Sequence, residues 1–301
     1  MDRSGPDGAK DVDDGESPGR LLIIGGAEDR CCGAGLLERF VELCGGDQAR
    51  LVLITTASEV PEEVLDTYER VFRKLGVEQI SELRLRGRDD ADGDRAADDR
   101  AADDRAAGDR AAGDRAARLL RDATGVFFSG GDQAKLRTLV GSRIISLISQ
   151  RLAEGLVAGG TSAGATAMGG TMILGGAGPD VSAATVQTGP GLGLVPHALI
   201  DMHFAERRRL PRLLSAVAGD PEHLGIGLDE NTGVLIEGDG FEVIGAGVAT
   251  VVDAKDATVV HAADGGDPIT LFGLRLHLLP AGCLFDFGSR RPAIGPAHSR
   301  H

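Results

Sequence analysis

A serine flanked by small residues is the first place in this sequence where the residue types could do covalent chemistry. The run LVAGGTSAGATAM places Ser162 in a G-x-S-x-G pattern, after an apolar stretch and before a helix-like run of small residues. This strand–turn–helix setting is typical of a catalytic serine, because bulky neighbours would block the chain where it doubles back. The Ala163 amide would then lie at a helix N-terminus and could donate to a developing oxyanion. The structural alternative is a glycine-rich turn that carries an incidental serine.

A second strand end carries glycines and polar side chains of a similar kind. In GVFFSGGDQ, which ends at Gln133, an apolar run is followed by a glycine pair and a polar dipeptide. Ligands of open α/β sheets bind beyond the carboxyl ends of the strands, so this segment and Ser162 should face one crevice. The Gly130 or Gly131 amide could complete an oxyanion site, and Asp132 or Gln133 could reach a substrate. Alternatively, Asp132 caps the helix that follows; the two roles are compatible, because capping uses only one of the two side chains.

A serine nucleophile needs a base and a group that orients the base. His203 stands apart from the other histidines because it lies where the run ALIDMHF gives way to an arginine-rich helix, although a structural role would also suit it there. Asp229 and Glu230 close the apolar run LGIGL, and a carboxylate in that place needs a partner such as His203. The order serine, histidine, acid argues against an α/β-hydrolase, in which the acid precedes the histidine.

Three consecutive arginines, Arg207 to Arg209, closely follow the candidate base. Such a run is usually a solvated helix face. At this place the guanidinium groups could instead bind substrate carboxylates through paired hydrogen bonds.

Five blocks of sequence carry a resemblance to a known family. They are IIGGAEDR, FFSGGDQ, GGTSAGATAM, DMHFAERRRLPRL and GIGLDENT, in that order, between about Leu21 and Gly238. Together they resemble the cyanophycinases, serine peptidases related to dipeptidase E. The resemblance implies an α/β fold of the class I glutamine-amidotransferase-like (flavodoxin-like) kind, with a mostly parallel sheet flanked by helices. It also implies a homodimer, and no cofactor or metal is expected.

The resemblance also implies roles for single residues. The nucleophile, histidine and glutamate of the family's triad fall on Ser162, His203 and Glu230. The family's substrate-binding positions fall on five polar residues: Gln133, Asp201, Arg207, Arg209 and Arg212. Met202 departs from the pattern, since the family commonly has glutamine there, and the missing amide removes a polar contact to the substrate.

The implied activity is hydrolysis of cyanophycin, a poly-aspartate backbone with arginine on β-amide links, to β-Asp-Arg dipeptides. The arginines would bind carboxylates, and acidic residues would bind the arginine side chains. The alternatives within hydrolases are a dipeptidase E-like Asp-dipeptidase and a β-aspartyl peptidase. A non-catalytic phosphate or nucleotide binder is disfavoured, because neither G-x-x-x-x-G-K-[ST] nor G-x-G-x-x-G occurs.

Composition narrows the class of protein further. The 301 residues are 42% hydrophobic, enough for a sizeable core, and a net charge of −14 argues against nucleic-acid binding. The acidic N-terminus lacks the apolar stretch that a secretory signal needs. The sequence also contains no run of 18 apolar residues, so no membrane helix is predicted. We therefore expect a cytoplasmic protein with reduced thiols, since the four cysteines match no zinc signature: Cys31, Cys32, Cys44 and Cys283.

The apolar pattern predicts one α/β peptidase domain over residues 20–288, between a disordered acidic tail (1–19) and a polar tail (289–301). Continuous apolar runs such as LLIIGG and LVLITT, separated by helical spacing, are βαβ units of a parallel sheet. After Glu222 the pattern changes to short strands, which we expect to extend or flank the main sheet.

Residues 94–117 repeat a five-residue unit, DRAAD or DRAAG. Its charges have the spacing of helical ion pairs, but each unit turns by roughly 140° on an ideal helix, so no apolar stripe forms. The repeat is therefore predicted to be a solvated, low-complexity insertion that the fold can lose.

Overall fold

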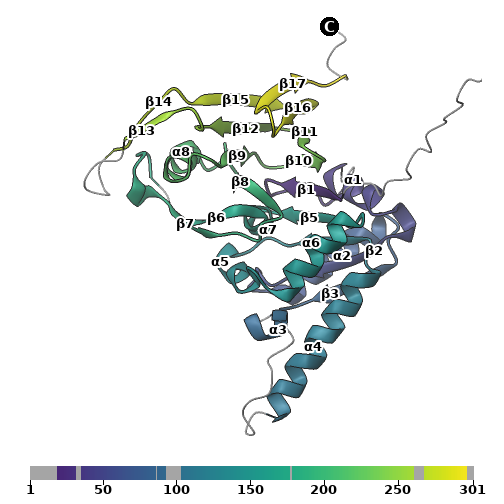
Figure 1. Cartoon of the computed structure of the whole chain (residues 1–301). Helices are drawn as coiled ribbons and strands as arrows, with labels where there is room; N and C mark the ends of the chain where they lie inside the picture. The colour runs from purple at the N-terminus through teal and green to yellow at the C-terminus, as the bar shows by residue number, and fades with distance from the viewer. Residues whose placement is uncertain are drawn as a thin grey trace, which may run out of the picture.

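Two large sheets and the helices packed against them make up the described part of the chain (Figure 1). The computed structural model describes residues 19–31, 35–85, 87–92, 103–176, 178–260 and 268–296. Apart from Gly19, the expected N-terminal tail lies outside these ranges, as does Cys32. No helix in the described ranges is long and apolar enough to cross a membrane.

The larger sheet has nine strands, and one half of it is parallel as the apolar runs predict. Strands β1, β5, β4, β2 and β3 pair in that order, all in parallel. The remaining four strands continue the sheet beyond β1 in antiparallel fashion. From edge to edge the strands are β17 (Arg291–Ile294), β16 (Cys283–Asp286), β11 (Gly240–Gly245), β10 (Thr232–Glu237), β1 (Arg20–Ile24), β5 (Val157–Thr161), β4 (Gly125–Phe128), β2 (Arg50–Ile54) and β3 (Gln79–Leu83).

The smaller sheet has six strands, of which β6, β8 and β9 run parallel. Strand β9 lies in this sheet, whereas the next strand along the chain, β10, lies in the larger one, so the chain passes between the sheets at Asp229–Asn231. The order is β15 (Arg275–Pro280), β12 (Val248–Asp253), β9 (Leu224–Leu228), β8 (Val195–Met202), β6 (Gly169–Gly175) and β7 (Gln187–Pro190), and a separate hairpin pairs β13 (Thr258–Val260) with β14 (Thr270–Phe272).

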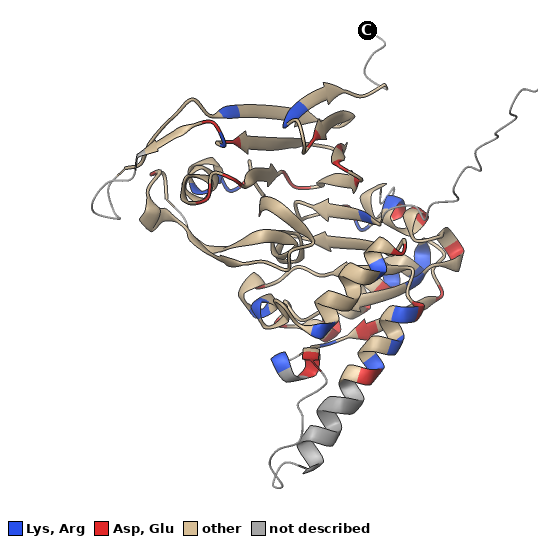
Figure 2. Ribbon diagram, in the orientation of Figure 1, with Lys and Arg blue, Asp and Glu red and all other residues tan. Residues whose placement is uncertain are grey.

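Strands β1, β2 and β4 are apolar at nearly every position because helices cover both faces of this part of the sheet. Leu22 and Ile24 of β1 join one core cluster with α1 and α2, and Leu21 and Ile23 join another with α4 and α6. Figure 2 shows that Lys, Arg, Asp and Glu are sparse on the central strands and frequent on the surrounding helices and loops. The helices are α1 (Gly35–Leu43), α2 (Pro61–Lys74), α3 (Arg88–Asp92), α4 (Asp103–Asp122), α5 (Gln133–Leu136), α6 (Arg143–Ala153), α7 (Ala163–Ala167) and α8 (Leu210–Gly219), with short 3₁₀ turns at Gly46–Gln48, Arg137–Leu139 and Ala183–Thr185.

The predicted α/β fold with additional C-terminal strands is confirmed. These strands extend both sheets, which makes each sheet mixed. The expected domain boundary at residue 288 is too early, because Arg291–Ile294 forms β17 and pairs with β16. This short edge strand has four exposed residues and only two of them apolar, so its sequence carries no alternating pattern.

The repeat also differs from its prediction at its C-terminal end. Helix α4 begins at Asp103 and includes the later units, and Ala116 and Ala117 are buried. Leu120, one turn further on, is fully buried against α6 and the larger sheet. The last unit therefore belongs to the part of helix α4 that packs into the core, and residues 94–102 lie outside the described ranges.

Candidate active site

Ser162 sits at a sharp turn between strand β5 and helix α7. Its backbone has φ of 51° and ψ of −115°, a conformation that costs a residue with a side chain about 1–3 kcal/mol. The two flanking glycines are required by close packing. A Cβ on Gly164 would lie 2.4 Å from the Phe128 carbonyl oxygen, and one on Gly160 would lie 3.0 Å from the carbonyl carbon of Gly164. The G-x-S-x-G pattern thus follows from the geometry of this turn.

His203 follows strand β8 and lies beside the loop after β1. Its backbone amide donates to the Gly25 carbonyl at 2.8 Å, and its φ is 50°. The imidazole lies flush against Gly26, whose φ is 101° and where an added Cβ would lie 2.4 Å from His203 Cε1. The loop after β1 therefore fixes both the backbone and the ring of His203.

Glu230 reaches the same imidazole from the crossing between the sheets. Its Oε1 lies 2.6 Å from His203 Nδ1, and Ser162 Oγ lies 3.0 Å from His203 Nε2. With the Nδ1 proton donated to Glu230, Nε2 is left to accept the Ser162 proton. These contacts form a hydrogen-bonded relay from Ser162 through His203 to Glu230. The His203 side chain is 11% exposed and that of Glu230 is 37% exposed, so the Glu230 end of the relay is the one nearer to solvent.

Asp229, the other acid that the sequence left open, has a structural role. Its Oδ1 accepts from the Ala205 amide at 3.1 Å and its Oδ2 from the Val248 amide at 3.0 Å. The Asp229 carboxylate therefore joins the segment after His203 to the start of β12, and Glu230 is the one of the two acids that contacts His203.

The three candidate oxyanion donors differ in how closely they approach the serine turn. Gly130 is closest in contact, since a Cβ there would lie 3.3 Å from Ser162 Cβ. Gly131 has φ of 144° and turns against the Ala57 carbonyl, 2.2 Å from an added Cβ. The Ala163 amide opens helix α7. Among the described residues, none of these three amides donates a hydrogen bond within the protein.

Asp201, one of the expected substrate-binding residues, has a completely buried side chain. It accepts from Arg209 Nη1 at 2.9 Å and from Arg212 Nε at 2.9 Å, and Arg212 Nη2 also bonds it. In this structure the Asp201 carboxylate therefore contacts two arginines. Burial lowers the pKa of Arg209 and the Asp201 carboxylate opposes this shift; the ordinary pKa of arginine is high enough to keep the guanidinium charged.

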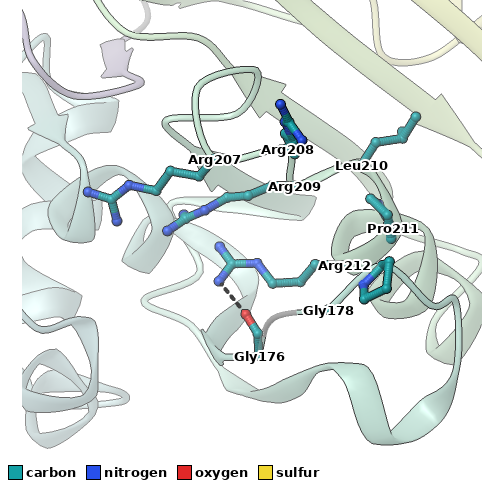
Figure 3. A pocket seen from close by; sticks show the side chains of 9 residues that line it. Gly176, Gly178, Arg207, Arg208, Arg209, Leu210, Pro211 and Arg212 are labelled. Atoms are coloured by element: carbon teal, nitrogen blue, oxygen red, sulfur yellow. Dashed lines mark hydrogen bonds between the residues drawn. The ribbon is translucent and has the colours of Figure 1, made fainter.

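Arg207, Arg209 and Arg212 line one cavity of about 590 Å³ together with Gly176 and Gly178. Figure 3 shows these three guanidinium groups extending to the same side, whereas Arg208 projects in another direction. Arg212 Nη1 also donates to the Gly176 carbonyl at 3.1 Å, which ties the arginine to the cavity wall. Two of these guanidinium groups, those of Arg209 and Arg212, share the single carboxylate of Asp201, so the cavity keeps an excess of positive charge.

Met202 and Gln133 are both engaged within the protein. The Met202 sulfur, at the position of the family glutamine, lies 2.7 Å from Arg209 Nη1. Gln133 Nε2 donates to the carbonyls of Ile173 and Leu174 at 3.1 and 3.0 Å, which leaves Oε1 for a ligand. The neighbouring side chain of Asp132 caps helix α5, as its alternative interpretation predicts.

The chain is similar to known proteins in both sequence and fold. The sequence model of peptidase family S51 matches residues 110–244 of the chain. Cyanophycinases from Trichormus variabilis and Thermosynechococcus vestitus are each 36% identical to the chain, over 91% and 89% of its length and 88% and 79% of theirs. The chain belongs to the cyanophycinase family. As a member of family S51 it is a serine peptidase. A peptidase from an acI-B1 actinobacterium shares the fold, with a TM-score of 0.59 at 21% identity over 86% of this chain and 98% of that one.

The contribution of the loop after β1 to this cyanophycinase-family site was not predicted from the sequence. The run IIGGAEDR contributes to the resemblance, but no role was predicted for Gly26 or Glu28. The signal was a glycine pair directly after a buried strand, the same pattern that drew attention to Gly130 and Gly131.

Proposed function

We propose that the chain is a serine exopeptidase that degrades cyanophycin to β-Asp-Arg dipeptides, with Ser162 on a nucleophile elbow. The observation that carries the proposal is the hydrogen-bonded relay from Ser162 through His203 to Glu230. Membership of a serine peptidase family supports the same assignment.

The relay supplies the proton transfers that amide hydrolysis needs. His203 Nε2 takes the Ser162 proton as Oγ attacks the scissile carbonyl carbon, and Glu230 stabilises the imidazolium through Nδ1–H. His203 then protonates the leaving amine as the C–N bond breaks and an acyl-enzyme remains. Water, deprotonated by His203, cleaves the ester and restores the Ser162 hydroxyl.

The amides beside Ser162 would stabilise the tetrahedral intermediates. Ala163 opens helix α7, so its N–H has no partner within the helix and is aligned with the helix dipole. Gly130 packs against Ser162 and supplies the second donor in this proposal. Gly131 serves by giving the backbone the turn that presents Gly130. Preorganised donors of this kind commonly contribute about 2.7–4 kcal/mol each to transition-state stabilisation.

The arginine-lined cavity supports a substrate with several carboxylates. In cyanophycin each arginine on a β-amide link keeps a free α-carboxylate, which matches a guanidinium group in charge and shape. Arg207 is exposed and, among the described residues, has no side-chain partner, so it is free to bind such a group. Asp201 holds Arg209 and Arg212 in place behind it.

Met202 favours a second candidate substrate, a shorter β-aspartyl peptide. Its thioether replaces the amide that the family commonly presents, and it contacts Arg209 within the protein. Fewer polar contacts would then be available to a long polymer.

The homodimer and the cytoplasmic location also remain proposals. Leu276 and Leu278 are exposed on β15, an edge strand of the six-stranded sheet, and Ile294 is exposed on β17, an edge strand of the larger sheet. Apolar side chains at free sheet edges favour pairing with a second copy. Sedimentation equilibrium would show the mass of one chain if this proposal is wrong.

The substrate assignment is tested by a matched pair of arginine variants. Wild type should release β-Asp-Arg from cyanophycin, and Arg207→Ala should lower kcat/KM about 10-fold or more through loss of a charge-assisted hydrogen bond. Arg208 also lines the cavity but its side chain projects in another direction, so Arg208→Ala removes the same charge and should stay within about twofold. Equal effects of the two changes, or cleavage of short β-aspartyl peptides alone, would contradict the polymer assignment.

A further inference from the structure

A buried carboxylate is bonded to the residue immediately before Ser162. Thr161, the last residue of β5, donates its hydroxyl to Glu28 Oε2 at 2.5 Å. Thr161 is buried, and the side chain of Glu28 is only 1% exposed. A charged group is costly to bury unless it is fully hydrogen-bonded, so the contact is built into the fold.

The other oxygen of Glu28 is anchored to helix α2. Its Oε1 accepts from the Tyr68 hydroxyl at 2.5 Å and from Arg30 Nη2 at 2.8 Å, and the Arg30 guanidinium stacks over the Tyr68 ring at 4.8 Å. Burial raises the pKa of Tyr68 well above its ordinary value, and the Glu28 charge adds to the effect. Tyr68 therefore remains a proton donor, and Glu28 joins the end of β5 to α2 through a rigid pair of contacts.

The serine turn needs such support because its backbone conformation is unfavourable. Ser162 has φ of 51° and ψ of −115°, and its own amide is held only by the Ile24 carbonyl at 3.1 Å. Strained residues persist where the surrounding structure holds them on several sides. The hydrogen bond from Thr161 to Glu28 supports the turn one residue upstream of Ser162, on the face of the sheet that packs against α2.

The loop after β1, which carries Glu28, also contacts the segments that carry His203 and Glu230. The Gly25 carbonyl accepts from the His203 amide, and the Gly26 carbonyl accepts from the Asn231 amide at 2.8 Å. The Asp29 amide donates to Asn231 Oδ1 at 3.1 Å, next to Glu230. Strands β1 and β5 are neighbours in the sheet (Figure 1), so one short loop contacts all three segments.

We propose that Glu28 is a positioning residue for catalysis: through Thr161 it fixes the Ser162 turn relative to His203 and Glu230. Glu28 does not touch the substrate, so its loss should slow acylation without weakening substrate binding. The proposal rests on Ser162 being the nucleophile.

The test uses the rate at which a fluorophosphonate labels Ser162, together with kcat and KM on cyanophycin. Thr161→Val keeps the branched shape and removes the hydroxyl, and it should lower the labelling rate and kcat by about 10- to 100-fold with KM nearly unchanged. Thr161→Ser restores the hydroxyl and should recover most of the rate. Glu28→Gln gives a second route to the same loss if the threonine variant folds poorly.

The matched control lies at the end of the neighbouring strand. Thr55 follows β2 and donates to Glu82 Oε1 at 2.6 Å, a bond of the same type at the same sheet edge. Thr55→Val should lower the thermal midpoint by a similar amount and leave labelling unchanged. Wild-type rates in folded Thr161→Val or Glu28→Gln, or an equal loss in Thr55→Val, would overturn the positioning role. Absence of Ser162 labelling in wild type would instead overturn the proposed function.

Discussion

Ser162, His203 and Glu230 come from three loops, and glycines close to them in space allow the first two to adopt their positions. The serine turn depends on glycines at 160 and 164, and the histidine ring depends on Gly26. The position of the acid in the sequence did not distinguish Asp229 from Glu230, because both close the same strand, whereas the family resemblance implied Glu230. In the structure, Glu230 is the one that contacts His203 Nδ1.

This separation gives a prediction for the two acids. Glu230→Gln should lower kcat by about 100-fold or more while the fold remains intact, since the imidazole loses its orienting charge. Asp229→Asn should mainly lower the free energy of unfolding, by about 1 kcal/mol, because Asp229 accepts two backbone amides and does not touch His203. Kinetics and chemical denaturation of both variants check this. An inactive but stable Asp229→Asn would mean that the triad acid is misassigned.

Residue types predicted the positions of the arginine cluster but not its internal contacts. A sequence pattern cannot show that Asp201 is buried, or that its two oxygens are used by Arg209 and Arg212. Those contacts depend on how helix α8 and strand β8 meet in space. The same limit applies to Glu28, whose partners Tyr68 and Thr161 lie 40 and 133 residues away.

Among the elements, strands buried on both faces were the most predictable. Runs such as LLII and LVLI are apolar at every position because helices cover both sides of the parallel half of the sheet. The edge strand β17 was missed because its four exposed residues show no alternation. The repeat was misjudged at its end, since a composition of alanine, arginine and aspartate does not reveal which alanines reach the core.

Helix α4 provides the prediction at this scale. Ala116 is fully buried in the core cluster, so Ala116→Glu should lower the free energy of unfolding by about 3 kcal/mol. Asp114→Glu, an exposed position on the same helix, should change it by no more than about 0.5 kcal/mol. Urea denaturation checks both. If Ala116→Glu unfolds at the wild-type midpoint, the repeat would be as dispensable as its sequence suggests.

The whole molecule places its candidate active site where the two sheets meet. Ser162 ends a strand of the nine-stranded sheet, His203 follows a strand of the six-stranded sheet, and Glu230 lies where the chain crosses between them. Membership of one sheet or the other depends on contacts far apart in sequence. The short C-terminal strands were therefore predictable as strands, but their division between two sheets was not.

A buried ion pair also joins the two sheets, away from this site. Asp253, at the end of β12, accepts from Arg275 of β15 at 3.0 Å and from Arg290, between β16 and β17, at 2.7 Å. Burial alone would raise the pKa of Asp253, but the hydrogen bonds from Arg290, the Lys255 amide and Arg275 outweigh it and hold that pKa below its ordinary value of 3.8. The pair therefore stabilises the fold above pH 3.8, and this contribution is lost as the pH falls through the lowered pKa.

The prediction is that Asp253→Asn lowers the free energy of unfolding by about 3 kcal/mol at pH 7, because it leaves the mostly buried Arg290 guanidinium uncompensated. The difference from wild type should shrink as the pH is lowered below 3.8. Asp256→Asn removes only an exposed partner of Arg275 and should change the free energy of unfolding little. Denaturation over a pH series checks this, and a difference that grows on acidification would contradict the assigned sign.

The central claim is that Ser162 cleaves the backbone of cyanophycin, and product identification tests it most directly. Purified protein incubated with cyanophycin should release β-Asp-Arg as the main soluble product, identified by mass spectrometry. Ser162→Ala should be folded and slower by several orders of magnitude. The account is contradicted if wild type releases no dipeptide, or if the folded Ser162→Ala variant releases it at a comparable rate.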